Sequence, residues 1–209
     1  MIAILGAGKM GEALLSGLLR AGRPPSDVAA VVRREVRAAE LRSTYGIPIV
    51  SAEEAAKTAT TLVIAVKPQD MARMLGEVAG FVATSQLVIS VAAGIKTSFI
   101  ERSLGTEIPV VRVMSNTPVV VDEAMSVISA GAFASEVHLR LAEDLLRPVG
   151  KVLRIPETQQ DAATEMTSCD VSTKAAISPS IRAMSWGLTV ITRVVAFLAA
   201  SSALTIGIP

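Results

Sequence analysis

The 209-residue sequence has a single cysteine, Cys169, and an aromatic content of only 3%. One cysteine excludes an internal disulfide framework and suits a reducing compartment, so we expect a cytoplasmic protein. The scarcity of aromatic side chains argues against a base-stacking platform for nucleic acid. The 20 basic and 19 acidic residues leave a net charge of +1, which gives no electrostatic reason to expect nucleic acid or an anionic membrane as a partner.

Long hydrophobic runs and clusters of metal-binding side chains are also missing. Residues 194–208 are uncharged, but this stretch is shorter than the about 18 apolar residues usual for a spanning helix, so we predict an apolar helix that does not cross a membrane. No basic region precedes the apolar residues 2–5, and no signal peptide is therefore predicted. The only histidine, His138, lacks partners for a metal ion, so no metal site is expected.

Short apolar segments alternate with segments of helical periodicity through the first 155 residues. The spacing predicts strands over 2–5, 28–32, 47–50, 62–66, 87–91, 109–114, 125–129 and 152–155. It predicts helices over 9–21, 35–44, 52–57, 69–79, 98–104 and 135–147. This alternation is typical of an α/β protein with a Rossmann-type, doubly wound and mostly parallel sheet.

The composition changes near Pro156. No carboxylate follows Asp170, and the remaining residues are rich in Ala, Ser, Ile and Val. We therefore predict a dinucleotide-binding domain over residues 1–156 and a short, atypical, helical C-terminal segment over residues 157–209.

A glycine-rich turn follows the first predicted strand and opens the first predicted helix. It consists of Gly6, Ala7, Gly8, Lys9, Met10 and Gly11. In such a turn the first glycine allows the tight bend, the second lets the backbone approach a pyrophosphate, and the third lets helix and strand pack closely. The N-terminus of the helix then faces the phosphates. The strand–turn–helix context favours a dinucleotide cofactor over a turn that serves packing alone.

Two arginines, Arg33 and Arg34, follow the second predicted strand, where an NAD-binding unit usually has an acidic residue. A carboxylate would repel a ribose 2′-phosphate, whereas a guanidinium can bind it through two parallel hydrogen bonds. The pair favours NADP(H) over NAD(H). The alternative is that both arginines are ordinary solvated charges at the start of a helix.

Three further motifs lie at the ends of later strands, where open α/β sheets bind their ligands. They are Ala65, Val66, Lys67 and Pro68; Ala92, Ala93 and Gly94; and Asn116 with Thr117 and Pro118. Small side chains would let a flat ring lie against the backbone, and Lys67 and Asn116 supply polar groups. A surface lysine and close packing of small residues explain the first two motifs equally well.

These motifs, in this order and spacing, resemble the N-terminal domain of the pyrroline-5-carboxylate reductase family. Gly150, Glu157 and the run from Asp161 to Thr164 resemble the next landmark of that family, so the resemblance covers about residues 1–168. It implies an enzyme that transfers hydride from a reduced nicotinamide, usually NADPH, to the C=N carbon of 1-pyrroline-5-carboxylate, with protonation of the ring imine, to give L-proline.

The resemblance also implies roles for the motifs. Residues 6–11 would hold the pyrophosphate, residues 65–68 and 92–94 would border the nicotinamide half, and Asn116 would lie beside the active-site cleft. The cofactor would supply the reducing chemistry while the protein aligns the two rings.

The sequence departs from the family after the run from Asp161 to Thr164. Where the family has a Ser-Gly-Ser-Gly-Pro-Ala segment and a helical domain that dimerises and completes the substrate pocket, this chain reads Thr167-Ser168-Cys169-Asp170. We therefore assign no catalytic proton donor, expect poor dimerisation, and interpret the tail as a truncated or frame-shifted ending. Two alternatives stay open: a non-catalytic NADP(H)-binding protein, and another NADP-dependent reductase of the hydroxyacid-dehydrogenase type.

Overall fold

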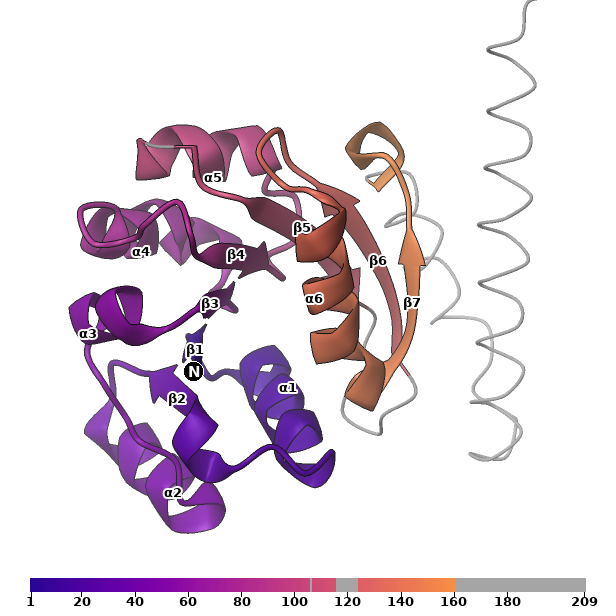
Figure 1. Ribbon diagram of the computed structural model, residues 1–209. Coiled ribbons are helices and arrows are strands. Elements are labelled where there is room, and N and C mark those ends of the chain that lie inside the picture. Colours follow the sequence, from indigo (N-terminus) through magenta and orange to yellow (C-terminus); the bar gives the residue numbers. More distant parts are fainter. Residues whose placement is uncertain (106, 116–123, 161–209) are drawn as a thin grey trace, which may run out of the picture.

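Figure 1 shows the computed structural model, which describes residues 1–105, 107–115 and 124–160. Within these residues seven strands form one sheet in the order β2-β1-β3-β4-β5-β6-β7. The strands are β1 (Ile2–Leu5), β2 (Val28–Val31), β3 (Thr61–Ile64), β4 (Leu87–Ser90), β5 (Val110–Ser115), β6 (Ala124–Ala130) and β7 (Gly150–Arg154). Strands β1 to β5 are parallel, β6 is antiparallel to β5, and β7 is parallel to β6. The predicted mostly parallel α/β sheet is confirmed.

The helices cover both faces of this sheet. They are α1 (Lys9–Arg20), α2 (Glu35–Tyr45), α3 (Ala52–Thr58), α4 (Met71–Val78), α5 (Thr97–Leu104) and α6 (Glu136–Leu146), with short 3₁₀ turns η1 (Pro25–Asp27), η2 (Pro68–Asp70) and η4 (Arg147–Val149). Helices α3, α4 and α5 pack on one face, and α1, α2 and α6 contribute to the core on the other (Figure 1). None of the described helices is long and apolar enough to cross a membrane.

Alternation along the strands supplies both cores. Ile2 and Ile4 of β1 contribute to the cluster under α1, whereas Ala3 and Leu5 contribute to the cluster under α3 and α4. Successive side chains of a strand point to opposite faces, so a strand covered on both sides is apolar throughout. This explains why the short apolar runs, rather than a strict polar–apolar alternation, marked the parallel strands in the sequence.

Two strand predictions need correction. The strand predicted over residues 47–50 is wrong, because this segment forms only an isolated bridge between Ala30 and Ile49. Two backbone hydrogen bonds join it to β2, from Ala30 N to Pro48 O and from Val50 N to Ala30 O. Pro48 has no N–H group to donate to a longer ladder. The strand predicted over residues 62–66 ends at Ile64, so Ala65 and Val66 lie in the loop beyond the sheet edge.

The first residues of the predicted C-terminal segment pack against the sheet domain. The Glu157 carboxylate accepts hydrogen bonds from Thr97 N at 2.7 Å and Thr97 Oγ1 at 2.8 Å, in the first turn of α5. Gln160 is fully buried, and its Nε2 donates to the carbonyl oxygens of Arg112 and Val127. The domain boundary at residue 156 stays a prediction. The helical C-terminal segment was predicted over residues 157–209, and residues 161–209 lie outside the described residues.

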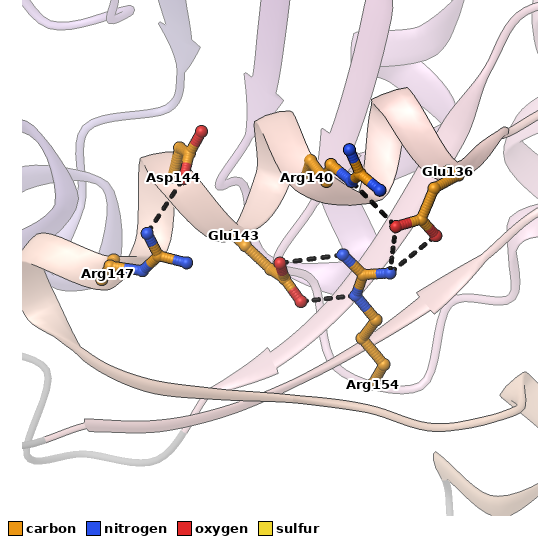
Figure 2. Close-up of polar contacts among 6 residues, drawn as sticks. All are labelled: Glu136, Arg140, Glu143, Asp144, Arg147 and Arg154. Carbon is orange, nitrogen blue, oxygen red and sulfur yellow. Dashed lines mark hydrogen bonds and ion pairs between the residues drawn. The ribbon is translucent and has the colours of Figure 1, made fainter.

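An ion-pair network joins α6 to β7 (Figure 2). Arg154 of β7 binds Glu143 through Nε and Nη2, and its Nη1 contacts both carboxylate oxygens of Glu136 at 2.8 and 2.7 Å. Arg140 also donates to Glu136. The hydrogen bonds from Arg154 lower the pKa of Glu136 and of Glu143, and the same bonds raise the pKa of Arg154. The network therefore ties the outermost strand to its covering helix by charge.

We expect Arg154→Ala to lower the melting temperature at pH 7 by a few degrees, and to lower it less in acid. Because the pKa values of Glu136 and Glu143 are lowered by folding, their pairs stabilise the protein fully above the ordinary carboxyl pKa of about 4.3 and lose this effect as the pH falls through the lowered values. Thermal denaturation between pH 7 and about pH 3 measures the difference.

The matched control is Arg147→Ala, because Arg147 pairs with Asp144 at 3.3 Å and both side chains are largely exposed. An exposed pair of this kind contributes little, so the control should melt close to the parent protein. An effect of Arg154→Ala that is equal at all pH values would contradict the ionic account.

Candidate functional site

A cleft of about 880 Å³ lies at the carboxyl ends of β1, β2 and β3. The segments that follow these three strands line it, together with residues of α2 and α4. Its lining includes nine of the residues predicted to bind a cofactor: Gly6, Ala7, Gly8, Lys9, Arg33, Arg34, Ala65, Val66 and Lys67. Parallel strands bring their carboxyl ends to one edge of the sheet, which explains how three segments far apart in the sequence meet here.

None of the other predicted residues that the structure describes is among the lining residues of the cleft. Met10, Gly11 and Pro68 belong to the same motifs but are not among the lining residues of the cleft. Ala92, Ala93 and Gly94 follow β4, the next strand in the sheet; Ala92 is buried, whereas Ala93 and Gly94 are exposed. Asn116 lies outside the described residues. The assignment of these residues to a cofactor site stays a prediction, as does that of the nine residues that line the cleft.

The three glycines of the turn have different surroundings. Gly6 has φ +91°, and a Cβ there would lie 2.7 Å from Val66 Cγ1. A Cβ at Gly11 would collide with the carbonyl oxygen of Gly6 and lie 3.2 Å from Ala65 Cβ. A Cβ at Gly8 would meet no protein atom within 4 Å. Packing thus explains Gly6 and Gly11, whereas Gly8 opens directly onto the cleft.

The open side of Gly8 lies at the start of α1. Gly8 is the N-cap residue, and Glu12 N donates the first helical hydrogen bond to its carbonyl oxygen. The first N–H groups of a helix have no partner within the helix, and the helix dipole favours negative charge beside them. A residue without a side chain at this position lets an anion approach those groups closely. The geometry fits a phosphate or pyrophosphate group.

Arg37 is a cleft residue that the sequence motifs did not indicate. Its Nε donates to the carbonyl oxygen of Ala7 at 3.1 Å, and its guanidinium pairs with Glu12 and with Glu40. The hydrogen bond to Glu12 raises the pKa of Arg37. Arg37 therefore ties α2 to the glycine turn. The available signal was its position in the first turn of the predicted helix, three residues after Arg34.

The Glu12 carboxylate is the centre of this tie. It accepts from Arg37 and from the Tyr45 hydroxyl, which lies 3.1 Å away at the far end of α2. Burial is the main cause of the raised pKa of Tyr45, and the hydrogen bond to Glu12 adds to it. One carboxylate on α1 thus holds both ends of α2 beside the cleft.

The sequence motifs also did not indicate the side of the cleft that η2 and α4 form. Gln69, Asp70, Arg73, Met74 and Glu77 line the cleft from η2 and α4. Asp70 Oδ1 lies 3.2 Å from Arg33 Nη2 and 3.5 Å from Arg73 Nη2. The arginine after β2 is therefore in direct contact with the opposite wall.

The described residues contain no cluster of side chains suited to a metal ion. No group of three or more His, Cys, Asp and Glu side chains in it could hold a metal ion. His138 instead accepts a hydrogen bond through Nδ1 from Ser135 N at 3.0 Å, at the start of α6.

Comparisons with known proteins agree with this geometry. Residues 1–94 match the model of a family described as NADP oxidoreductase, coenzyme F420-dependent. The chain is 38% identical over 170 residues to a pyrroline-5-carboxylate reductase of Corynebacterium melassecola, a match that covers 79% of this chain and 63% of that protein. It is 35% identical over 189 residues to a pyrroline-5-carboxylate reductase of Methanosarcina acetivorans, covering 89% of this chain and 68% of that protein.

The chain belongs to the pyrroline-5-carboxylate reductase family. The crystal structure of Plasmodium falciparum pyrroline carboxylate reductase with NADP bound is similar in fold, with a TM-score of 0.71 at 21% identity; the match covers 100% of this chain and 84% of that chain. The present chain spans less than two thirds of the length of the Corynebacterium pyrroline-5-carboxylate reductase.

The glycine turn of this pyrroline-5-carboxylate reductase family member allows a stability test. We expect Gly11→Ala to lower the free energy of unfolding by about 1–3 kcal/mol, because its Cβ has no space against Gly6 O and Ala65. Gly8→Ser should leave the stability nearly unchanged. Gly8 has φ −76° and ψ −165°, an extended N-cap conformation that serine adopts readily. Denaturant unfolding of the two variants measures the difference, and equal losses would contradict the separate roles of the two glycines.

Proposed function

We propose that this protein is an NADP(H)-dependent oxidoreductase that reduces 1-pyrroline-5-carboxylate to L-proline. The observation that carries the proposal is the open space at Gly8, over the start of α1, in a chain of the pyrroline-5-carboxylate reductase family. The carboxyl edge of β1, β2 and β3 provides a cleft of about 880 Å³, at the place where open α/β sheets bind dinucleotides.

The residues around this cleft fit the phosphate groups of NADP(H). Gly8 and the first turn of α1 would hold the pyrophosphate, and Arg33 and Arg34 would bind the ribose 2′-phosphate. Both arginine side chains are exposed at the mouth of the cleft. The family described as an NADP oxidoreductase and the NADP bound in the Plasmodium falciparum relative support this choice. The preference for NADP(H) over NAD(H) is part of the proposal.

The nicotinamide half would lie toward β3 and β4. When bound, a reduced nicotinamide supplies the hydride that the imine carbon receives. The chain's contribution would be to orient the ring between residues 65–68 and residues 92–94, where small side chains let it lie close to the backbone. Gly94 is exposed, and its φ of +72° is a conformation that glycine adopts readily.

We assign no catalytic proton donor and no binding site for the substrate carboxylate. The poor dimerisation and the cytoplasmic location expected from the sequence stay predictions beside this proposal.

The proposed function is tested by NADPH titration and by NADPH oxidation with and without 1-pyrroline-5-carboxylate. We expect NADPH to bind the parent protein, and to bind Gly8→Ser at least about tenfold more weakly because the new side chain fills the space beside the helix N-terminus. Oxidation that depends on 1-pyrroline-5-carboxylate supports the reductase.

The other outcomes distinguish the alternatives. Tight NADPH binding without turnover would support a non-catalytic NADP(H)-binding protein. Turnover only with a hydroxyacid or its ketone would support a hydroxyacid-dehydrogenase-type reductase. Absence of NADPH binding would contradict all three.

We further expect Arg33→Asp combined with Arg34→Asp to weaken NADPH binding far more than NADH binding, because only NADPH carries the 2′-phosphate. The matched control combines Arg42→Asp with Arg102→Asp, which changes the net charge equally at exposed positions that do not line the cleft. Dissociation constants for both cofactors measure the effect. Equal losses for NADPH and NADH would show that the two arginines do not recognise the 2′-phosphate.

A further inference from the structure

Two arginines from different walls of the cleft converge on one carboxylate oxygen. Arg33 follows β2 and Arg73 lies in α4, yet the Nη2 atoms of both contact Asp70 Oδ1, at 3.2 and 3.5 Å. All three residues line the cleft. Arg73 also pairs through Nη1 with Glu77 at 2.5 Å.

This arrangement has the form of an anion site that the chain's own carboxylate occupies. Carboxylates and phosphates accept the same hydrogen bonds from a guanidinium group, so either can occupy the space between two arginines. Arg33 is one of the residues proposed above to bind the ribose 2′-phosphate. An incoming phosphate would meet Asp70 at the guanidinium that it must contact.

We propose that Asp70 is a specificity-determining residue that competes with the 2′-phosphate of NADP(H) for Arg33 and Arg73. The proposal rests on the proposed function, because it concerns the ligand of the same cleft. It adds Arg73 to the cations that the phosphate would contact and makes Asp70 the residue that limits the affinity of this end of the cleft.

The high exposure of Arg33 indicates that Asp70 competes with an incoming phosphate for this arginine rather than holding the arginine in place for it. Arg33 is 65% exposed, and exposed ion pairs restrain a long side chain only weakly. Loss of the Asp70 carboxylate therefore removes little order from Arg33. The same loss removes a negative charge from beside the space where a phosphate group with up to two negative charges would lie, and like charges at short range oppose binding.

The test is Asp70→Asn, which keeps the shape of the side chain and removes its charge. The probes are 2′,5′-ADP, which carries the 2′-phosphate, and 5′-AMP, which lacks it. We expect 2′,5′-ADP to bind about threefold to tenfold more tightly to Asp70→Asn than to the parent protein, with 5′-AMP nearly unchanged. Titrations belong at low ionic strength, because salt screens exposed charges.

The matched control is Glu53→Gln. Glu53 pairs with Lys57 on α3, outside the cleft, so this variant removes one negative charge without touching Arg33 or Arg73. Its affinity for 2′,5′-ADP should equal that of the parent. In an Arg73→Gln background the gain from Asp70→Asn should shrink, because the competition then concerns one arginine instead of two. Asp70→Ser serves as a second variant, and thermal melts confirm that each protein folds.

The outcomes separate this inference from the proposed function. If the parent binds 2′,5′-ADP and NADPH but Asp70→Asn binds 2′,5′-ADP equally or more weakly, the inference is wrong and the proposed cofactor site stands. An equal gain for 5′-AMP also overturns it, because the effect is then one of general charge. If neither the parent nor the variants bind 2′,5′-ADP or NADPH, both proposals are wrong.

Discussion

The close approach of α1 to the sheet is the contact on which the rest of the candidate site depends. Gly11 packs against the carbonyl oxygen of Gly6 and against Ala65 with no space for a side chain. This contact brings the start of α1 to the carboxyl ends of β1 and β3, where Gly8 and Lys9 line the cleft. A larger residue at position 11 would move the helix, and with it the space at Gly8 that fits a phosphate group.

Charge then holds the surrounding helices in place. Glu12 of α1 accepts from Arg37 and Tyr45 of α2, and Arg37 also donates to the carbonyl oxygen of Ala7 within the glycine turn. On the other side of the cleft, Asp70 of η2 contacts Arg33, which follows β2. Three of the cations that line the cleft, Arg33, Arg37 and Arg73, thus have carboxylates of the same chain as partners. An anion that enters the cleft would have to compete with such a carboxylate for its arginine.

At the other end of the sheet, the antiparallel strand β6 and the edge strand β7 extend the domain away from the cleft. Arg154 joins β7 to α6 by ion pairs on the surface (Figure 2). Glu157 and Gln160 then bring the chain back onto α5 and β5, where Glu157 accepts from Thr97 at the start of α5. This return places the end of the described chain beside the strand that leads to Asn116.

The sequence by itself determined the class of the fold and the identity of the glycine turn. Both depend on local order: apolar runs that alternate with helical periods, and a glycine-rich turn that follows a strand and opens a helix. Local order also misled at residues 47–50, because these apolar residues include Pro48, which lacks an N–H group, and they form an isolated bridge instead of a strand. Only the tertiary structure decided that Arg37, Asp70 and Arg73 line the cleft, and that a Cβ fits at Gly8 but not at Gly11. Both facts depend on distances between segments that are far apart in the sequence. The packing of helices and strands fixes these distances, and no pattern along the chain does.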